Sequence, residues 1–203
     1  MTPIRTKKSR LPRSERREQL IAVSRTVFVE EGYHAASMDQ IAERAGVSKP
    51  VLYQHFPSKL SLYTALVDEA CDDMIEAARK ALGSTKNNAQ RIEATVRLWY
   101  EFVGQEGQAF RLVFDSDLTN DPHIRDQLER VNHESAAGIA EIIMEDTGLD
   151  YDSALLLASN LIGGGHMSAR TWFSSGSSLS IDEAAALTSK LLWRGIAGFP
   201  KAD

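Results

Sequence analysis

The sequence holds little cysteine and little proline, and it lacks long hydrophobic runs. Its single cysteine, Cys71, cannot form a disulfide within the chain, which favours a reducing compartment. No apolar run approaches the ~20 residues that span a bilayer, and no hydrophobic core follows the basic N-terminus. Only six prolines occur, and alternating β-branched residues are scarce, which favours helices over strands. We therefore expect a cytoplasmic all-α protein, with neither a signal peptide nor a membrane as partner.

Signatures of catalysis and of metal binding are also missing. The five histidines have no metal-ligand spacing. The sequence has no G-x-S-x-G nucleophile elbow, no Walker loop and no C-x-x-C pair. The three glycines at 163–165 lack the preceding strand and the following Lys-Ser/Thr of a phosphate loop, so they rather indicate close backbone approach to a partner subunit or a ligand. We expect no enzyme, no metal and no cofactor.

The most informative segment, residues 37–56, has the pattern of two short helices joined by a tight turn. Ser37 can cap the first helix with its hydroxyl. Gly46 lies where that helix must end and turn. Ser48 can cap the second helix, and Pro50 is tolerated only in a first turn. This pattern is typical of a helix-turn-helix, which places its second helix in the DNA major groove. The alternative is an ordinary helical hairpin with a solvated face.

The second helix offers side chains suited to DNA. Gln54 can pair with an adenine edge, and Val51 can touch a thymine methyl group. Phosphate oxygens suit a further group of side chains on this helix or just after it, namely Lys49, Tyr53, His55 and Lys59.

The charge is divided unevenly along the chain. Residues 1–59 carry 11 lysines and arginines against 6 acidic residues, whereas residues 60–203 carry 12 against 22. A basic head of this kind attracts the phosphate backbone. We expect residues 1–12 to be a flexible basic arm that orders on DNA. Residues 13–59 would be the DNA-binding domain, with Arg13 among its contacts, and residues 60–203 a helical ligand-binding and dimerisation domain.

The run RREQLIAVSRTVFVEEGYHAASMDQIAERAGVSKPVLYQHFPSKLSLYTAL resembles the DNA-binding domain of the tetracycline-repressor (TetR) family. The matches at fixed spacing include Arg17, Phe28, Gly32, Tyr33, Ile41, Ala42, Ala45, Gly46, Val47, Leu52, Phe56 and Leu62. The resemblance implies a three-helix head and a helical bundle behind it. It also implies DNA contacts at Ser37, Lys49, Pro50, Val51, Tyr53, His55 and Lys59.

The body reads as a series of helices over residues 58–82, 90–104, 121–146, 151–173 and 181–199. The family resemblance implies a homodimer built on the last two of these helices and an apolar cavity for a small-molecule effector. Large apolar side chains at helical spacing are candidates for lining that cavity, although the same spacing is typical of plain core. They are Trp99, Phe102, Val103, Phe110, Phe114, Ile139, Ile143, Met167 and Trp172.

Two stretches, GYHAASMDQIAERAGVSKPVLYQHFPSKLSLY and QAFRLVFDSD, make the chain similar to actinobacterial regulators of fatty-acid synthesis within that family. This resemblance implies a double-stranded DNA operator, near-palindromic for a dimer, and a long-chain acyl-CoA effector that weakens DNA binding. The acidic body speaks against a phosphate-rich effector. One alternative is a TetR-like repressor of an efflux or catabolic gene that responds to another apolar compound. The other is a helical interaction module that binds no DNA.

Overall fold

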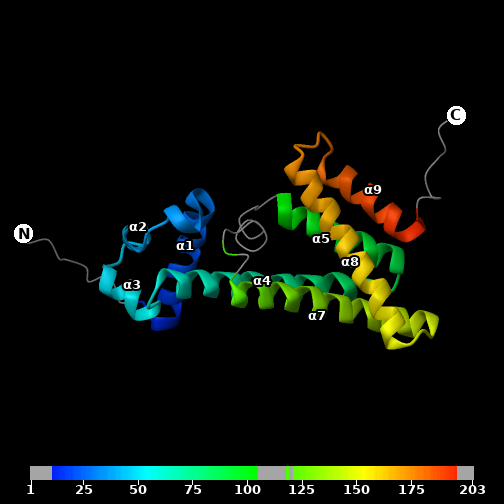
Figure 1. The fold of residues 1–203 in the computed structure, drawn as a ribbon, viewed down its shortest axis with the longest axis horizontal. Coiled ribbons are helices and arrows are strands. Elements are labelled where there is room, and N and C mark those ends of the chain that lie inside the picture. Colours follow the sequence, from blue (N-terminus) through cyan, green and yellow to red (C-terminus); the bar gives the residue numbers. More distant parts are fainter. Residues whose placement is uncertain (1–10, 105–117, 119–120, 196–203) are drawn as a thin grey trace, which may run out of the picture. The chain divides into compact units, whose positions relative to one another are not determined.

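The computed structural model describes residues 11–104, 118 and 121–195, and it confirms the all-α fold with a helix-turn-helix head (Figure 1). The helices are α1 (Arg13–Ala35), α2 (Met38–Arg44), α3 (Lys49–His55), α4 (Lys59–Gly83), α5 (Asn88–Gly104), α7 (Pro122–Thr147), α8 (Tyr151–Ser174) and α9 (Ile181–Arg194). No strand occurs in these ranges. The chain divides into two compact units, a head unit that ends at Leu66 and a body unit that begins at Val67.

The head unit is built around aliphatic side chains from α1, α2 and α3. Leu20 and Val27 of α1, Ile41 of α2 and Leu52 of α3 are all 0% exposed. Their burial is the main favourable contribution to folding in so small a unit. The two short helices are thereby held against α1, which is the arrangement that the sequence predicts.

Lys59, at the start of α4, ties the end of α1 into the head unit. Its Nζ donates hydrogen bonds to the backbone carbonyls of Tyr33, His34 and Ala36 at 2.8, 3.2 and 2.9 Å. The ammonium also lies 4.5 Å from the centre of the Tyr33 ring. These carbonyls follow Gly32, whose φ of 78° interrupts the regular helix and leaves acceptors without helical donors. Lys59 satisfies them.

We expect Lys59→Met to lower the free energy of unfolding by about 2 kcal/mol, because several carbonyls lose a charged donor while the aliphatic stem is kept. Urea unfolding followed by circular dichroism measures the loss. Lys86→Met, at an exposed position between α4 and α5, is the control and should change stability little. Equal stability of the two variants would contradict the structural role of Lys59.

The helices of the body unit pack mainly as α5 against α9 and α7 against α8 (Figure 1). Their starts are fixed by capping side chains: Asp121 accepts from the N–H of His123 at 2.9 Å, and Asp150 accepts from that of Ser153 at 2.9 Å. A capping box formed by Ser180 and Glu183 opens α9. These boundaries fall close to the predicted ones.

The last helix is shorter than predicted. The sequence pattern extends it to Phe199, but α9 ends at Arg194. Gly195 adopts φ 65° and ψ −177°, which is not helical, and glycine reaches this conformation without the strain that a side chain would add. Residues 196–203 lie outside the described residues.

The three consecutive glycines lie inside α8 without breaking it. A Cβ added at Gly164 would meet Cδ2 of Leu192 at 3.0 Å, so the missing side chain lets α9 approach α8 closely. This close approach is to a helix of the same chain, whereas the predicted approach to a partner subunit or a ligand stays a prediction.

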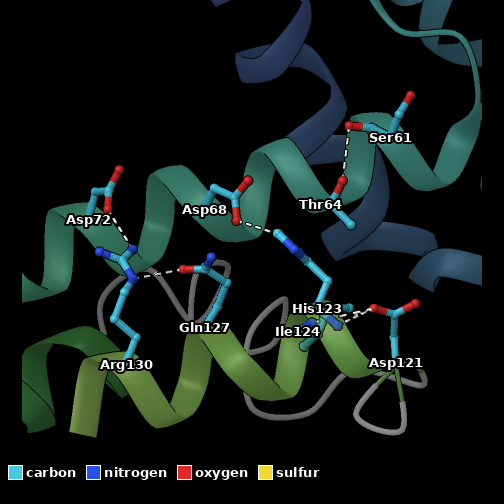
Figure 2. A network of polar contacts seen from close by, with 9 residues as sticks. All are labelled: Ser61, Thr64, Asp68, Asp72, Asp121, His123, Ile124, Gln127 and Arg130. Atoms are coloured by element: carbon cyan, nitrogen blue, oxygen red, sulfur yellow. Dashed lines mark hydrogen bonds and ion pairs between the residues drawn. The ribbon is translucent and has the colours of Figure 1, made fainter. Parts of the chain in front are cut away.

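Two polar ties join α4 to α7 within the body unit, and Figure 2 shows them. Asp68 lies 2.7 Å from Nε2 of His123, and Asp72 accepts from Nη2 of Arg130 at 2.6 Å.

Cys71, between the two aspartates on α4, is fully buried. Burial raises the pKa of its thiol to about 12. The charge of Arg130 lowers this pKa, and the neighbouring carboxylates raise it. A thiol held protonated in this way is an inert part of the core.

Candidate DNA-binding surface and body pocket

The turn between α2 and α3 has the geometry that the sequence indicates. Ser37 is the N-cap of α2, and its side chain accepts from the N–H of Gln40 at 3.2 Å. Gly46 has φ 63°, a left-handed conformation that permits the tight turn. Ser48 occupies the N-cap position of α3, but its side chain accepts no hydrogen bond there, so Pro50 in the first turn does more to fix this start.

A hollow of about 600 Å³ lies between the N-terminal turn of α1 and the exposed face of α3. We call it the recognition groove. Its lining includes four of the predicted DNA contacts, and these are Arg13, Val51, Gln54 and His55. Arg16 also lines it, a residue of the basic N-terminal cluster that was not among the predicted DNA contacts. The sequence could have indicated this residue, because Arg16 follows Arg13 by one helical turn and so lies on the same face of α1.

The arginines of α1 act on the electrostatics of His55. Burial lowers the pKa of His55, and the positive charges of Arg13, Arg16 and Arg17 lower it further. The lowered pKa favours the neutral imidazole at pH 7 in the free protein. The cations of this surface come from the guanidinium groups.

The other predicted DNA contacts differ in their solvent exposure and in whether they already interact with another residue. Pro50 and Tyr53 are exposed, and Tyr53 has 40% of its surface accessible. Lys49 is exposed too, although its Nζ lies 2.7 Å from Oδ1 of Asp39 on α2, an interaction that raises the pKa of Lys49. Lys59 is already used in the head unit, as described above. Its contact with DNA stays a prediction and has the least support from the geometry.

The body unit contains a largely apolar pocket of about 470 Å³, the body pocket, between α5, α7, α8, α9 and the last turn of α4. Three predicted ligand contacts, Trp99, Ile139 and Ile143, line it. Four others do not, and these are Phe102, Val103, Met167 and Trp172. Phe110 and Phe114 lie outside the described residues.

Three of the four predicted side chains that do not line the body pocket have identifiable environments. Val103 is fully buried, so it belongs to the core, whereas Met167 is 63% exposed. Trp172 packs edge-on against Tyr100 and donates to the carbonyl of Leu179 at 2.8 Å. Ile92 and Val96, on the same inner stripe of α5 as Trp99, line the pocket but were not among the predicted ligand contacts. Their spacing to Trp99 could have identified them.

Residues 20–66 match the model of the bacterial regulatory proteins, tetR family. Over 192 residues the chain is 39% identical to the HTH-type transcriptional activator FasR of Mycolicibacterium smegmatis, a match that covers 95% of this chain and 88% of that protein. The chain belongs to the TetR family. It is therefore a DNA-binding transcriptional regulator and not an enzyme, as expected.

Other TetR proteins resemble the chain over most of its length. It is 25% identical to the HTH-type transcriptional repressor KstR2 of Rhodococcus jostii over 189 residues, covering 91% of this chain and 93% of that protein. A TetR-like regulator from Rhodococcus sp. RHA1 superposes with a TM-score of 0.70 at 26% identity, covering 94% of this chain and all (100%) of that one. Bacillus subtilis FadR, in complex with stearoyl-CoA, superposes with a TM-score of 0.72 at 19% identity, covering 88% and 98%.

Two further observations concern the described ranges of this TetR protein. None of its helices there is both long enough and apolar enough to cross a membrane. The same residues include no group of three or more histidine, cysteine, aspartate or glutamate side chains placed to hold a metal ion.

Proposed function

We propose that this TetR-family regulator controls genes of fatty-acid or lipid biosynthesis and that a long-chain acyl-CoA in the body pocket weakens its binding to DNA. The observation that carries the proposal is the apolar body pocket in a chain 39% identical to FasR over nearly its whole length. Stearoyl-CoA is the ligand of the FadR structure with the same fold. A pocket of about 470 Å³ lies in the usual range for small-molecule sites.

The proposed DNA-binding form is a homodimer. Apolar side chains stand in water on α8 and α9 of the single chain, including Leu156 at 73% exposure, Leu187 at 45% and Leu191 at 41%. Exposed apolar surface of this extent favours association with a second copy. Two heads related by a two-fold axis would enter successive major grooves about 34–36 Å apart, so the operator would be near-palindromic.

The proposed coupling uses α4, which contributes residues to both units. A ligand that displaces the body part of α4 would change the position of the head and so its affinity for DNA. By linkage, DNA would weaken effector binding by the same factor.

Footprinting on a fragment from upstream of fatty-acid synthesis genes tests the proposal. We expect a protected near-palindrome whose protection is lost when palmitoyl-CoA is added. A protected site that palmitoyl-CoA leaves intact would reject the acyl-CoA effector and favour the alternative, a repressor of an efflux or catabolic gene that responds to another apolar compound. Mass spectrometry of ligand co-purified under native conditions would then identify that compound.

We expect Tyr53→Ala to weaken operator binding about tenfold, because each head loses a hydrogen bond to the phosphate backbone. The loss should be similar for variant operators, since phosphate contacts carry little sequence information. Fluorescence anisotropy with labelled DNA measures it. Tyr151→Ala is the matched control, because Tyr151 is 42% exposed, close to the 40% of Tyr53, but lies at the start of α8. Unchanged affinity of the Tyr53 variant would remove this residue from the interface.

A further inference from the structure

The wall of the body pocket that α5 forms carries a row of two polar side chains and an aromatic one. Arg91, Thr95 and Trp99 follow one another at intervals of four residues along α5, and all three line the pocket. Residues four apart lie above one another on the same face of a helix, about 6 Å apart along its axis. The row therefore passes from a cation through a hydroxyl to an aromatic ring along one wall.

Thr95 is the unusual member of this row. It is only 7% exposed, and its hydroxyl oxygen has no hydrogen-bond partner among the described residues. A helical threonine can bond to the carbonyl four residues earlier, but Thr95 does not. A buried polar atom without a partner costs stability, and its presence in the wall of a pocket indicates a ligand that supplies the partner.

Two hydrogen bonds fix the position of the Arg91 side chain, and they use only two of its three guanidinium nitrogens. Its Nε donates to the carbonyl of Thr85 at 2.7 Å, and its Nη1 donates to Oδ1 of Asn88 at 3.0 Å. Asn88 in turn donates from Nδ2 to the carboxylate of Asp146. The amide thus stands between the two charges, and Arg91 forms no ion pair with a described residue. Neither of these hydrogen bonds uses Nη2, the other terminal nitrogen of this pocket-lining residue.

Most of the remaining lining is apolar and suits a hydrocarbon chain, although Asp146, Thr147 and Asn160 also line the pocket. Ile92, Val96 and Ile162 lie among its apolar lining, and Trp99 closes the row on α5. A ligand that satisfies both ends has an alkyl chain beside Trp99 and an oxygen-bearing, anionic head near Thr95 and Arg91.

We propose that Thr95 and Arg91 bind the head of an acyl ligand, with the Thr95 hydroxyl donating to the acyl carbonyl oxygen and Arg91 pairing with the anionic group behind it. The proposal rests on the acyl effector proposed above and adds the orientation of that ligand in the pocket. In an acyl-CoA that anionic group is a phosphate beyond the thioester. In a free fatty acid the carbonyl oxygen and the anionic group are one carboxylate, whose two oxygens would be divided between Thr95 and Arg91.

The test is the affinity of the full-length protein for palmitoyl-CoA and for palmitate, measured by isothermal titration calorimetry. Arg91→Gln should weaken binding about tenfold or more through the lost charge-assisted contact. Arg97→Gln is its matched control, because Arg97 is an exposed residue of the same helix, paired with Glu101 and Asp182. Weaker binding of both ligands would place the acyl carboxyl end at Arg91, and weaker binding of palmitoyl-CoA alone would place a phosphate there.

Thr95→Val provides the second arm, since valine keeps the shape and removes the hydroxyl. Without ligand, its melting temperature should equal or exceed that of the wild type, because an unpartnered buried hydroxyl is gone. Its affinity for palmitoyl-CoA should nevertheless fall about fivefold. Ser135→Ala is the control: its hydroxyl is also buried and unpartnered, but it lines the neighbouring hollow and not the body pocket.

These measurements distinguish a wrong assignment of the head site from a wrong assignment of the effector. If the wild type binds palmitoyl-CoA and the Arg91 and Thr95 variants bind it within twofold as tightly, the assignment of the head site is wrong while the effector stands. If the wild type binds neither ligand, the acyl effector itself is rejected and this inference falls with it.

Discussion

Leu52→Ala is expected to destabilise the head unit by about 3 kcal/mol and to abolish detectable operator binding. Leu52 is 0% exposed, and it is the one buried residue of α3. Truncating a buried leucine to alanine costs about 2–5 kcal/mol, because burial is lost and a cavity remains. The head unit is small, so this is a large part of what holds its recognition helix in place.

Urea unfolding and anisotropy with the footprinted operator measure the two effects of this substitution. Leu60→Ala is the control, because Leu60 lies early in α4 with 39% of its surface exposed. It should change stability by less than about 0.5 kcal/mol. A Leu52 variant that binds the operator as tightly as the wild type would show that α3 does not depend on this anchor, which would contradict the described packing.

Raising the salt concentration from 50 to 200 mM is expected to weaken operator binding about a thousandfold. The recognition groove presents Arg13 and Arg16, and Lys49 is exposed on α3, the helix that contributes Val51, Gln54 and His55 to the groove. Two heads would then neutralise about six phosphates, and each released counterion adds to the slope of log Kd against log salt. His55 adds little to this slope because its lowered pKa favours the neutral imidazole at pH 7.

Variants locate the source of this salt dependence. Arg16→Gln should make the slope shallower by about two, one unit for each head. Arg79→Gln should leave it unchanged, since Arg79 is an exposed residue of the body unit that pairs with Glu76. A wild-type affinity that changes less than threefold across this range would contradict a phosphate-gripping surface.

Much of the fold could be predicted because helix boundaries are encoded locally. Asp121, Asp150 and Ser180 each cap the helix that follows, and Gly148 ends α7 with φ 72°. The end of α9 was missed because the apolar pattern continues beyond Gly195 in the sequence. The conformation of that glycine, rather than a change of pattern, ends the helix.

The sites were less predictable, because helical spacing cannot tell a core position from a pocket wall. Val103 and Trp99 lie four residues apart on α5, yet only Trp99 lines the body pocket. Lys59 is a similar case in the head unit, where a cation suited to phosphate also donates to backbone carbonyls at the end of α1 and just after it. In each case the outcome depends on which other helix lies opposite, and that information is tertiary.

The single thiol of this protein can serve as a probe of local opening in the body unit. With a pKa of about 12, Cys71 ionises hardly at all while it is enclosed, and the sequence contains no second cysteine to add background. An alkylating reagent can therefore modify the native chain only during moments when the neighbourhood of Asp68 and Asp72 comes apart. The rate of alkylation then measures how often this local opening occurs. A compound that binds and changes the opening frequency changes the alkylation rate, so its binding can be detected without labelling the compound.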